Sequence, residues 1–548
     1  GTLFPYTTLF RSIHSSNVTS EEAYQAAIDQ VKAAPRYEDI QSESSAAWKE
    51  IWDRIDIKIR GDRLVQKLVR LHLYHSLVTA SPHHVQLDAG IPARGLHGEA
   101  YRGHIFWDEL FIMPFYDFYF PETARSVLMY RYRRLPAARK YAREEGYRGA
   151  IFPWQSGLEG REETQRIHLN PIDEKWGPDF SYLQRHVSLA IAYNIWQYLW
   201  ITDDLAFIEV YGAEIFLEIC RYWGEKATFN EETGRYDIEN VMGPDEFHEK
   251  YAEAEEGGLR NNAYTNIMVV WALNRAFDLL ELISGEAKQA LLEKISLTEA
   301  ELDRWKKVSR KLTLTLSKEG ILEQFEGYFN LKELDWEHYQ NEYGDIHRMD
   351  RILKSEGKSP NEYKVAKQAD ALMVFFLLSE EEISAILRQL GYHPPENMLE
   401  KNFHYYLQRS SHGSTLSRLV HAHLASKIGE HELSWKLYLD AVRSDFMDIQ
   451  GGSTKEGIHM GVMTGTALFV LSAFTDLNWV GGHISLTPRL PSGWQEIKFK
   501  LFFRNAEYNL EISSNKLRLK VENEGEKTIF VRGEKYQLQP GTWQEIDI

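Results

Sequence analysis

A long succession of helical patterns, followed near the C-terminus by strand patterns, constrains the fold of this 548-residue chain more than any other feature. Between about Ser44 and Leu477, apolar residues recur at the 3.6-residue helical period, and loops rich in Gly, Pro and Trp separate the segments. Successive helices with few strands between them indicate a mainly α protein built from helical hairpins, and the lack of a fixed-length repeat argues against an open solenoid. Examples of the expected helices are Leu64–Val78, Leu183–Trp200, Leu205–Trp223, Asn262–Leu282, Leu302–Leu314, Val365–Leu378, Glu380–Leu390, Leu416–Lys427 and Glu430–Arg443.

Near Gly481 the pattern changes to short alternating runs broken by Pro, Gly and Asn, which predict a small β domain. Its expected strands are Ile484–Leu486, Glu496–Phe503, Tyr508–Ser513, Lys516–Glu522, Lys527–Arg532 and Lys535–Gln539. At the other end, Ser20–Ala33 has the pattern of a capped helix and leads into a polar connection. We therefore expect a helical linker at 13–45, a helical domain at 46–478 and a β domain at 479–548. The composition break at 1–12 is interpreted as a non-native or ragged N-terminus.

The charge balance and the cysteine count exclude several classes of function. An excess of 80 acidic over 63 basic residues gives a net charge of −17, which disfavours nucleic acid and anionic membranes as partners. The single cysteine, Cys220, lies in an apolar helical run and can form neither an internal disulfide nor a thiolate metal cluster. No apolar run approaches the roughly 18 residues of a membrane span, and no signal peptide is visible, so we expect a cytoplasmic protein with a small neutral ligand.

The segment Val241–Glu249 combines three carboxylates and an imidazole in a turn. Pro244 fixes its own φ and pushes Gly243 out of the α region, so Asp245 and Glu246 follow on a loop whose shape the backbone determines. Loops held on a rigid scaffold commonly carry catalytic groups, and this turn is the first candidate for acid chemistry. A solvated acidic surface turn is the alternative interpretation.

Further loops combine aromatic, amide and charged residues. They are His97–Glu109, Ile151–Gly157, Asn261–Asn266 and Lys367–Asp370, and the amides at the helix starts, Asn262 among them, suit recognition of sugar hydroxyls. Aromatic residues make up 13% of the chain, and flat apolar rings beside hydrogen-bonding groups are what pyranose rings require. Helix caps and ordinary core filling are the alternatives.

The segment Arg409–Ser417 places Ser, Thr, Gly and His412 before a helix, and Gly451–His459 has a similar composition further along. Hydroxyl groups and free backbone N–H groups at a helix N-terminus form an anion site, with an ordinary Ser414 or Thr415 cap as the alternative. Metal binding is not expected, because the histidines are scattered and neither a His-Glu-x-x-His helix nor a Cys pair occurs. No dinucleotide or nucleotide fingerprint occurs either, so no cofactor is expected.

With these motifs in order, the chain from roughly residue 13 onward resembles glycoside hydrolase family 65, which contains maltose, kojibiose and trehalose phosphorylases. The motifs that carry the resemblance are Phe106-Trp107-Asp108, Pro153-Trp154-Gln155, Gly243-Pro244-Asp245-Glu246, Lys367-Gln368-Ala369-Asp370 and His412-Gly413-Ser414-Thr415-Leu416-Ser417. The resemblance implies an (α/α)6 barrel with a C-terminal β-sheet domain, and an N-terminal β-sandwich that this chain would lack. It also implies a homodimer for the full-length family form.

The resemblance implies a role for each matched residue. Glu246 falls on the general acid, and Trp107, Asp108, Lys367 and Gln368 fall on positions that hold the transferred glucose. Trp154 and its neighbour Gln155 fall on the outer sugar subsite. Ser414, Thr415 and His459 fall on the phosphate-binding positions, where the family usually has two serines rather than Ser and Thr.

Three functions remain open, in descending order of preference. The first is inverting phosphorolysis of an α-linked glucose disaccharide, in which inorganic phosphate is the nucleophile and a single carboxyl, Glu246, protonates the leaving oxygen. The second is an inverting α-glucosidase, which needs a second carboxylate to activate water, with Glu456 as the candidate base. The third is a noncatalytic sugar-binding protein, because a fold does not guarantee its usual function.

Overall fold

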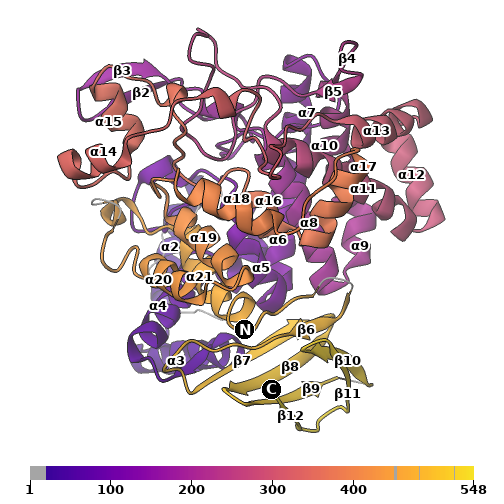
Figure 1. The fold of residues 1–548 in the computed structure, drawn as a ribbon. Coiled ribbons are helices and arrows are strands. Elements are labelled where there is room, and N and C mark those ends of the chain that lie inside the picture. The colour runs from indigo at the N-terminus through magenta and orange to yellow at the C-terminus, as the bar shows by residue number, and fades with distance from the viewer. Residues whose placement is uncertain (1–19, 450–452, 480–481, 524) are drawn as a thin grey trace.

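The computed structural model describes residues 20–449, 453–479, 482–523 and 525–548, and it consists of a helical body standing on a small β domain (Figure 1). The inferred N-terminal remnant 1–12, the first part of the inferred linker and Gly451–Gly452 lie outside the described residues. The helices are α2 Ser20–Lys32, α3 Tyr37–Ile55, α4 Arg63–Thr79, α5 Glu109–Tyr119, α6 Pro121–Arg133, α7 Leu135–Glu144, α8 Val187–Thr202, α9 Leu205–Phe207, α10 Ala213–Lys226, α11 Ala263–Leu282, α12 Gly285–Ile295, α13 Glu299–Lys311, α14 Trp336–Tyr343, α15 Met349–Ser355, α16 Met373–Leu377, α17 Glu380–Gln389, α18 Met398–Leu407, α19 Thr415–Lys427, α20 His431–Val442 and α21 Met460–Ser472.

Six of these helices form a closed inner ring. Helix α5 packs on α8, α8 on α11, α11 on α16, α16 on α19, α19 on α21, and α21 packs back on α5. Helices α8 and α21 are apolar around most of their circumference and almost fully buried, as expected for helices enclosed on all sides. Helices α4, α6, α10 and α20 pack against the ring from outside. The architecture is therefore an (α/α)6 barrel, as the resemblance implies.

The C-terminal domain contains two sheets. The larger has the strand order β1-β7-β8-β9-β12, formed by Lys58–Arg60, Glu496–Phe503, Ala506–Ser513, Lys516–Glu522 and Gln544–Asp547. The smaller has the order β11-β10-β6, formed by Glu534–Leu538, Lys527–Val531 and Ile484–Leu486, in which β10 runs parallel to β6. Alternate residues of β7 are buried, which matches the alternating sequence pattern and places one face of the sheet against the barrel.

Aromatic contacts join the sheets to the barrel. The Tyr119 hydroxyl at the end of α5 donates to the Lys500 carbonyl at 2.7 Å, and Phe118 packs edge-on against Trp479 at 5.0 Å. On α20, Trp435 packs against Trp494 at 5.8 Å. Two short hairpins complete the fold: β2 Ile167–Asn170 with β3 Lys175–Pro178, and β4 Thr228–Asn230 with β5 Arg235–Asp237.

Several expected elements differ from the structure. Of the expected helix Val365–Leu378, only Met373–Leu377 is helical, because residues 366–370 bond to loops at 243–245 and 409–413. The expected helix Leu205–Trp223 is interrupted by a π-helical turn at Ile208–Gly212. Strands β1 and β12 were not expected, and β1 pairs with β7 although more than 400 residues of sequence separate them.

Candidate active site

The turn Gly243–Glu249 has a backbone that its neighbours determine. A Cβ at Gly243 would overlap the carboxylate of Asp370 and the amide of Asn262, so this position requires glycine. Asp245 is fully buried and turns away from the surface, and its carboxylate accepts bonds from Gln324 and from the ring and backbone N–H of His248. Glu246 has φ +64°, a left-handed conformation that is uncommon outside glycine, Asn and Asp. The turn therefore separates the two carboxylates, with Asp245 inside.

The Glu246 carboxylate meets the Lys367–Asp370 motif, more than 100 residues away in sequence. Lys367 Nζ donates to Oε2 at 2.8 Å, and Gln368 Nε2 donates to Oε1 at 2.7 Å and to the Pro244 carbonyl at 2.8 Å. The Glu246 side chain keeps 23% of its surface exposed. It is thus held by two donors and still reachable from outside, as a proton donor to a substrate must be.

Asn262 lies beneath this pair. Its side-chain oxygen caps α11 by accepting from Thr265 N–H at 2.9 Å, and its amide donates to both carboxylate oxygens of Asp370 at 3.1 and 3.2 Å. Burial, and then the charge of Asp245, raise the pKa of Asp370 well above its ordinary value. The structure therefore uses both polar atoms of Asn262 within the protein, whereas the sequence interpretation assigned it to substrate.

Trp107 and Trp154 form an aromatic wall with two further rings. Trp107 lies edge-on to His186 at 4.8 Å, with Tyr264 at 6.4 Å and Trp154 at 6.2 Å. Burial lowers the pKa of His186 to about 3, so its ring is neutral. The preceding loops pair through backbone bonds between Ile105 and Ser156 at 2.9 Å, which brings the first two motifs together. Aromatic rings gathered in this way offer apolar faces and edges suited to the apolar face of a sugar ring.

Asp108 lies next to the wall and within the electrostatic influence of Glu246. Burial, and then the Glu246 charge, raise the pKa of Asp108 to about 7. Gly461 at the start of α21 lets the Asp108 side chain lie close to this helix, since a Cβ at Gly461 would lie 3.2 Å from Asp108 Oδ1. Neighbouring Trp107 also lines, with Gln368 and Ser417, a small hollow at the inner end of the site.

Gln155 lies at the outer edge of the same wall. The Gln155 side-chain oxygen lies 3.1 Å from Nδ1 of His104. Gln155 is partly exposed. Trp154, by contrast, is 5% exposed.

The predicted anion loop borders the Glu246 pair. Gly413 N–H donates to the Lys367 carbonyl at 2.8 Å, so the loop and the lysine that holds Glu246 are directly joined. Ser414 is the N-cap of α19, accepting from Leu416 N–H at 3.3 Å, and Thr415 begins the helix. Burial, and then His421, Arg418 and His347, lower the pKa of His412 well below its ordinary value. His412 is therefore neutral, and it can offer a hydrogen bond to an anion but no charge.

His459 is the N-cap residue of α21 and is oriented by Asp445. The Asp445 carboxylate accepts from His459 Nδ1 at 2.8 Å and from its backbone N–H at 2.7 Å, which leaves Nε2 for another partner. Burial opposes ionisation of Asp445, but the bonds from His459 and Thr454 hold its pKa below the ordinary value. Arg94 donates to the Gly457 carbonyl at 2.6 Å and lies beside His459.

Glu456, the candidate base of the hydrolase alternative, lies in a short 3-10 turn Thr454–Glu456 and its side chain is exposed. A Cβ at Gly98 would overlap the Glu456 carbonyl, so the loop 95–98 packs directly on this turn. No group of three or more potential metal-ligating side chains occurs among the described residues.

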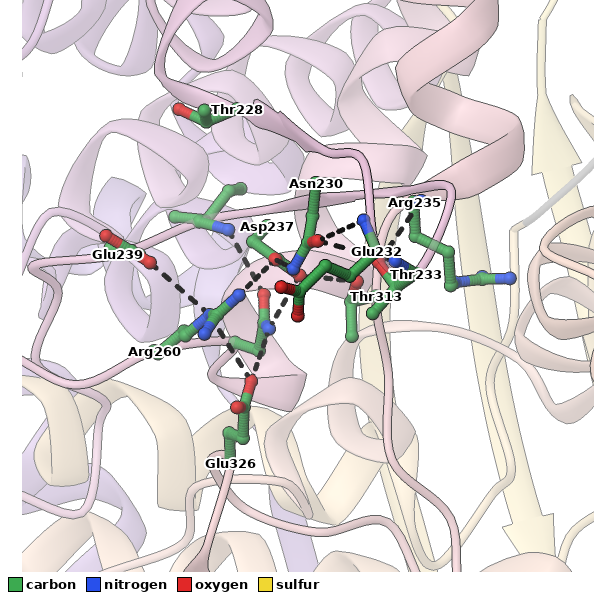
Figure 2. A network of polar contacts seen from close by, with 12 residues as sticks. Thr228, Asn230, Glu232, Thr233, Arg235, Asp237, Glu239, Arg260, Thr313 and Glu326 are labelled. Atoms are coloured by element: carbon green, nitrogen blue, oxygen red, sulfur yellow. Dashed lines mark hydrogen bonds and ion pairs between the residues drawn. The ribbon is translucent and has the colours of Figure 1, made fainter.

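A polar network at the base of the Glu246 loop holds its two ends together. Figure 2 shows Asp237 at the centre: its carboxylate accepts from Asn230 at 2.9 Å, Thr313 at 2.6 Å and Asn261 at 2.9 Å, and it pairs with Arg260. Burial opposes ionisation, but these donors lower the pKa of Asp237 to about 2. Strand β5 before the loop and helix α11 after it are thereby fixed to each other.

Sequence reasoning missed three residues of this site. Arg94, His186 and Asp445 are isolated in sequence, and only packing brings them to the motif residues. A hollow lined by Ser317, Ile321, Phe329, Asn397 and Tyr405 contains none of the motif residues.

A closed (α/α)6 barrel with a carboxyl between two loops, an aromatic wall and a hydroxyl-rich helix N-terminus defines a class of carbohydrate-active barrel proteins. The chain belongs to glycosyl hydrolase family 65: residues 70–468 match its central catalytic domain and residues 477–538 match its C-terminal domain.

Known relatives support this assignment. The chain is 42% identical to trehalose 6-phosphate phosphorylase of Lactococcus lactis over 512 residues, covering 93% of this chain and 64% of that protein. It is also 42% identical to an uncharacterized glycosyl hydrolase of Mycobacterium tuberculosis, covering all of this chain and 41% of that protein. A solved structure of a putative kojibiose phosphorylase from the human microbiome aligns with a TM-score of 0.81 at 26% identity, covering 97% of this chain and 73% of that one. The chain thus spans less than two thirds of the length of the curated relatives it matches first.

None of the described helices is long and apolar enough to cross a membrane.

Proposed function

We propose that the protein catalyses inverting phosphorolysis of an α-linked glucoside, producing β-glucose 1-phosphate and a free acceptor. The observation that carries the proposal is the direct bond between Gly413 N–H and the Lys367 carbonyl, which joins the hydroxyl-rich loop to the lysine holding Glu246. A proton donor and a site suited to an anion then face the same sugar. The relative from Lactococcus lactis, by its name, is itself a phosphorylase.

Each group has one part in the proposed reaction. The glucosyl unit lies on Trp107 and Trp154, and its hydroxyls bond to Asp108, Lys367 and Gln368. Because Lys367 and Gln368 now donate to Glu246, a bound sugar would compete for them and release that carboxyl for protonation.

Inorganic phosphate, held by Ser414, Thr415 and the free Nε2 of His459, attacks C1 from the face opposite the leaving group. The bond from phosphate oxygen to C1 forms as the bond from C1 to the bridging oxygen breaks, and Glu246 gives its proton to that oxygen. Neutral His412 adds a hydrogen bond. The proposed chemistry uses inorganic phosphate as a co-substrate and needs no cofactor.

The proposal is tested with a panel of substrates, each with and without inorganic phosphate: kojibiose, nigerose, maltose, trehalose and trehalose 6-phosphate. We expect cleavage of at least one substrate only with phosphate, and β-glucose 1-phosphate as the product. Equal rates without phosphate, with free glucose released, would instead support the hydrolase with Glu456 as its base. Binding without turnover of any α-glucoside would support the noncatalytic alternative.

The variant Glu246→Gln tests the role of the acid. Loss of a general acid costs roughly 100- to 10,000-fold in rate, and we expect kcat on an unactivated disaccharide to fall by that amount while the circular dichroism spectrum is unchanged. Glu239→Gln, an exposed carboxylate on the same loop, is the control. Near-normal turnover by Glu246→Gln would remove Glu246 from this role.

A further inference from the structure

Helix α15 meets the β2–β3 hairpin at the upper left of Figure 1. Three side chains of this junction, two of them arginines, are near enough to influence one another electrostatically. Asn170 Nδ2 on β2 donates to the Arg351 carbonyl on α15 at 3.1 Å. His168 lies two residues before Asn170, so both side chains project from the same face of the strand, toward α15. Arg348 immediately precedes this helix. We call Arg348, Arg351 and His168 the entrance cluster.

The entrance cluster adjoins the proposed catalytic groups. The Ser411 hydroxyl donates to the His347 carbonyl at 3.0 Å, and a Cβ at Gly413 would overlap that carbonyl, so residue 347 touches the proposed phosphate loop. Burial opposes protonation of Arg348, but Asp350, and further Tyr101 and Glu246, raise its pKa. Arg348 keeps 36% of its side chain exposed, whereas Trp107 at the inner wall is 3% exposed. The cluster is therefore on the outer side of Glu246.

Two donors in the cluster have no acceptor among the described residues: Nε of Arg351 and Nε2 of His168, both buried atoms. The His168 proton is placed by its neighbour, because Gln165 Nε2 donates to Asp179 at 3.1 Å and to His168 Nδ1 at 3.1 Å. With Nδ1 accepting, Nε2 carries the N–H of the neutral ring. Buried donors are nearly always satisfied by protein or by ordered water, so these two donors in adjoining elements each require an acceptor from outside the chain, a water or a bound ligand.

Several carboxylates lie around the cluster, and none of those described forms an ion pair with Arg351: Asp179 accepts from Gln165 beside His168 at 3.1 Å. The Asp350 carboxylate accepts two hydrogen bonds from the Arg348 guanidinium, at 3.0 and 2.8 Å. Lys354 forms an ion pair with Glu249 at 3.6 Å. Arg351 forms no ion pair with any described carboxylate, although Glu456 is near enough to influence it. Burial lowers the pKa of Arg351, and Arg348 lowers it further. A half-buried, unpaired guanidinium is costly, and an anion would relieve that cost.

We propose that the entrance cluster binds a phosphate group carried by the leaving sugar, so that the substrate is a phosphorylated α-glucoside. Its phosphate offers several acceptor oxygens to the donors of Arg351, His168 and Arg348, which a neutral hydroxyl could not match in charge. Glu246 protonates the oxygen that joins the glucosyl unit to the leaving sugar. Side chains on the outer side of Glu246 therefore contact the leaving sugar. The inference rests on the proposed phosphorolysis. The phosphate on the sugar takes no part in bond breaking and leaves on the acceptor unchanged.

The reverse reaction provides a matched pair of probes. β-Glucose 1-phosphate is supplied with either glucose or glucose 6-phosphate as acceptor, and kcat/KM is measured for each. We expect glucose 6-phosphate to be preferred, and Arg351→Met to reduce the ratio of the two kcat/KM values by at least about tenfold, the size expected for a lost charge-assisted hydrogen bond. Arg351→Lys, which keeps the charge, should retain part of the preference. Arg161→Met, which removes the same charge from a side chain 74% exposed, should retain all of it.

Calorimetric titration of glucose 6-phosphate and of glucose into each variant, without glucose 1-phosphate, measures the cluster independently of turnover. We expect glucose 6-phosphate to bind more tightly than glucose, and Arg351→Met to abolish this difference. That result would support the inference even if no reaction were observed. Equal handling of both acceptors by the unaltered protein would overturn it while leaving phosphorolysis intact. A raised KM for inorganic phosphate in Arg351→Met, with the acceptor ratio unchanged, would also overturn it and assign the cluster to the nucleophile.

Discussion

At the scale of single residues, burial raises the pKa of one carboxyl group of the site, that of Asp108. Asp108 and Glu246 are near enough to influence each other, yet they have different surroundings. Glu246 has two donors on its oxygens, whereas Asp108 lies close to Gly461 and comes directly after Trp107 of the aromatic wall. Two carboxyls in different environments can take different roles in one reaction.

The pH dependence of stability should reveal the Asp108 proton. The pKa rises from the ordinary 3.8 to about 7 in the folded protein, so between these values folding takes up a proton and the stability from Asp108 falls as pH rises. Asp108→Asn cannot titrate. We expect its free energy of unfolding, minus that of the unaltered protein, to increase from about pH 4 to about pH 7 and then level off. Urea unfolding across this range measures the difference.

Asp303→Asn, which removes a carboxylate 62% exposed on α13, is the control for the loss of one charge. A difference between Asp108→Asn and the unaltered protein that stays constant across the pH range would contradict the prediction.

Gly243 is the second residue whose substitution has a defined consequence. In Gly243→Ala the added methyl overlaps Asp370 and Asn262, and overpacking of this kind costs about 1–3 kcal/mol. We expect a lower melting temperature and a lower kcat, because the turn that carries Glu246 must shift. Gly285→Ala, at the open first position of α12, is the matched control and should be neutral or slightly stabilising. A Gly243→Ala protein with normal melting and turnover would refute the overlap.

At the scale of elements, the Asp237 network joins hairpin β4–β5 to helix α11 at the base of the catalytic loop. In Asp237→Asn the Arg260 pair and the charge-assisted bonds are lost, at a cost of about 1–3 kcal/mol. Since the pKa of Asp237 is lowered from 3.8 to about 2, its stabilising contribution is complete above pH 4 and is lost as pH falls toward 2. The two proteins should therefore differ most above pH 4 and converge in acid.

Chemical unfolding at pH 2.5 and pH 7 checks this prediction, with Glu232→Gln, an exposed carboxylate in the turn of the same hairpin, as the control. If the free energies of unfolding of Asp237→Asn and the unaltered protein differed equally at both pH values, ionised Asp237 would not be the source of the stabilisation.

The elements also show where sequence periodicity is sufficient. Strands β6, β7 and β9 have the expected bounds, because alternation along the chain directly reflects one buried and one exposed face. The expected helix Val365–Leu378 is mostly wrong, for a physical reason. Its apolar residues recur at the helical period, but the backbone of Lys367 and the side chain of Gln368 form hydrogen bonds with the loops at 244–245 and 413 instead of within a helix. The tertiary bonds outweigh the local preference.

At the scale of the whole molecule, the barrel and the β domain share one continuous apolar core. Tyr119, Phe118 and Trp435 of the barrel rest on the β domain and its connecting segment, and β1 leaves the helical region to pair with β7. We expect a single calorimetric unfolding transition for the two parts. Removal of 479–548 should leave the barrel aggregated or dye-binding, because its apolar lower face is exposed. Two separate transitions, or a soluble monomeric barrel, would contradict this.

The sequence by itself determined most of the helical and strand segments and the order of the motifs, because neighbours within a few residues encode periodicity and turns. The resemblance to family 65 then assigned the role of acid to Glu246. Tertiary structure alone decided which side chains meet. It joined Glu246 to Lys367, oriented His459 through Asp445, bonded Asn262 to Asp370 and brought Arg351 to Asn170 of strand β2. Such contacts depend on packing summed over the whole chain, which no local window of sequence contains.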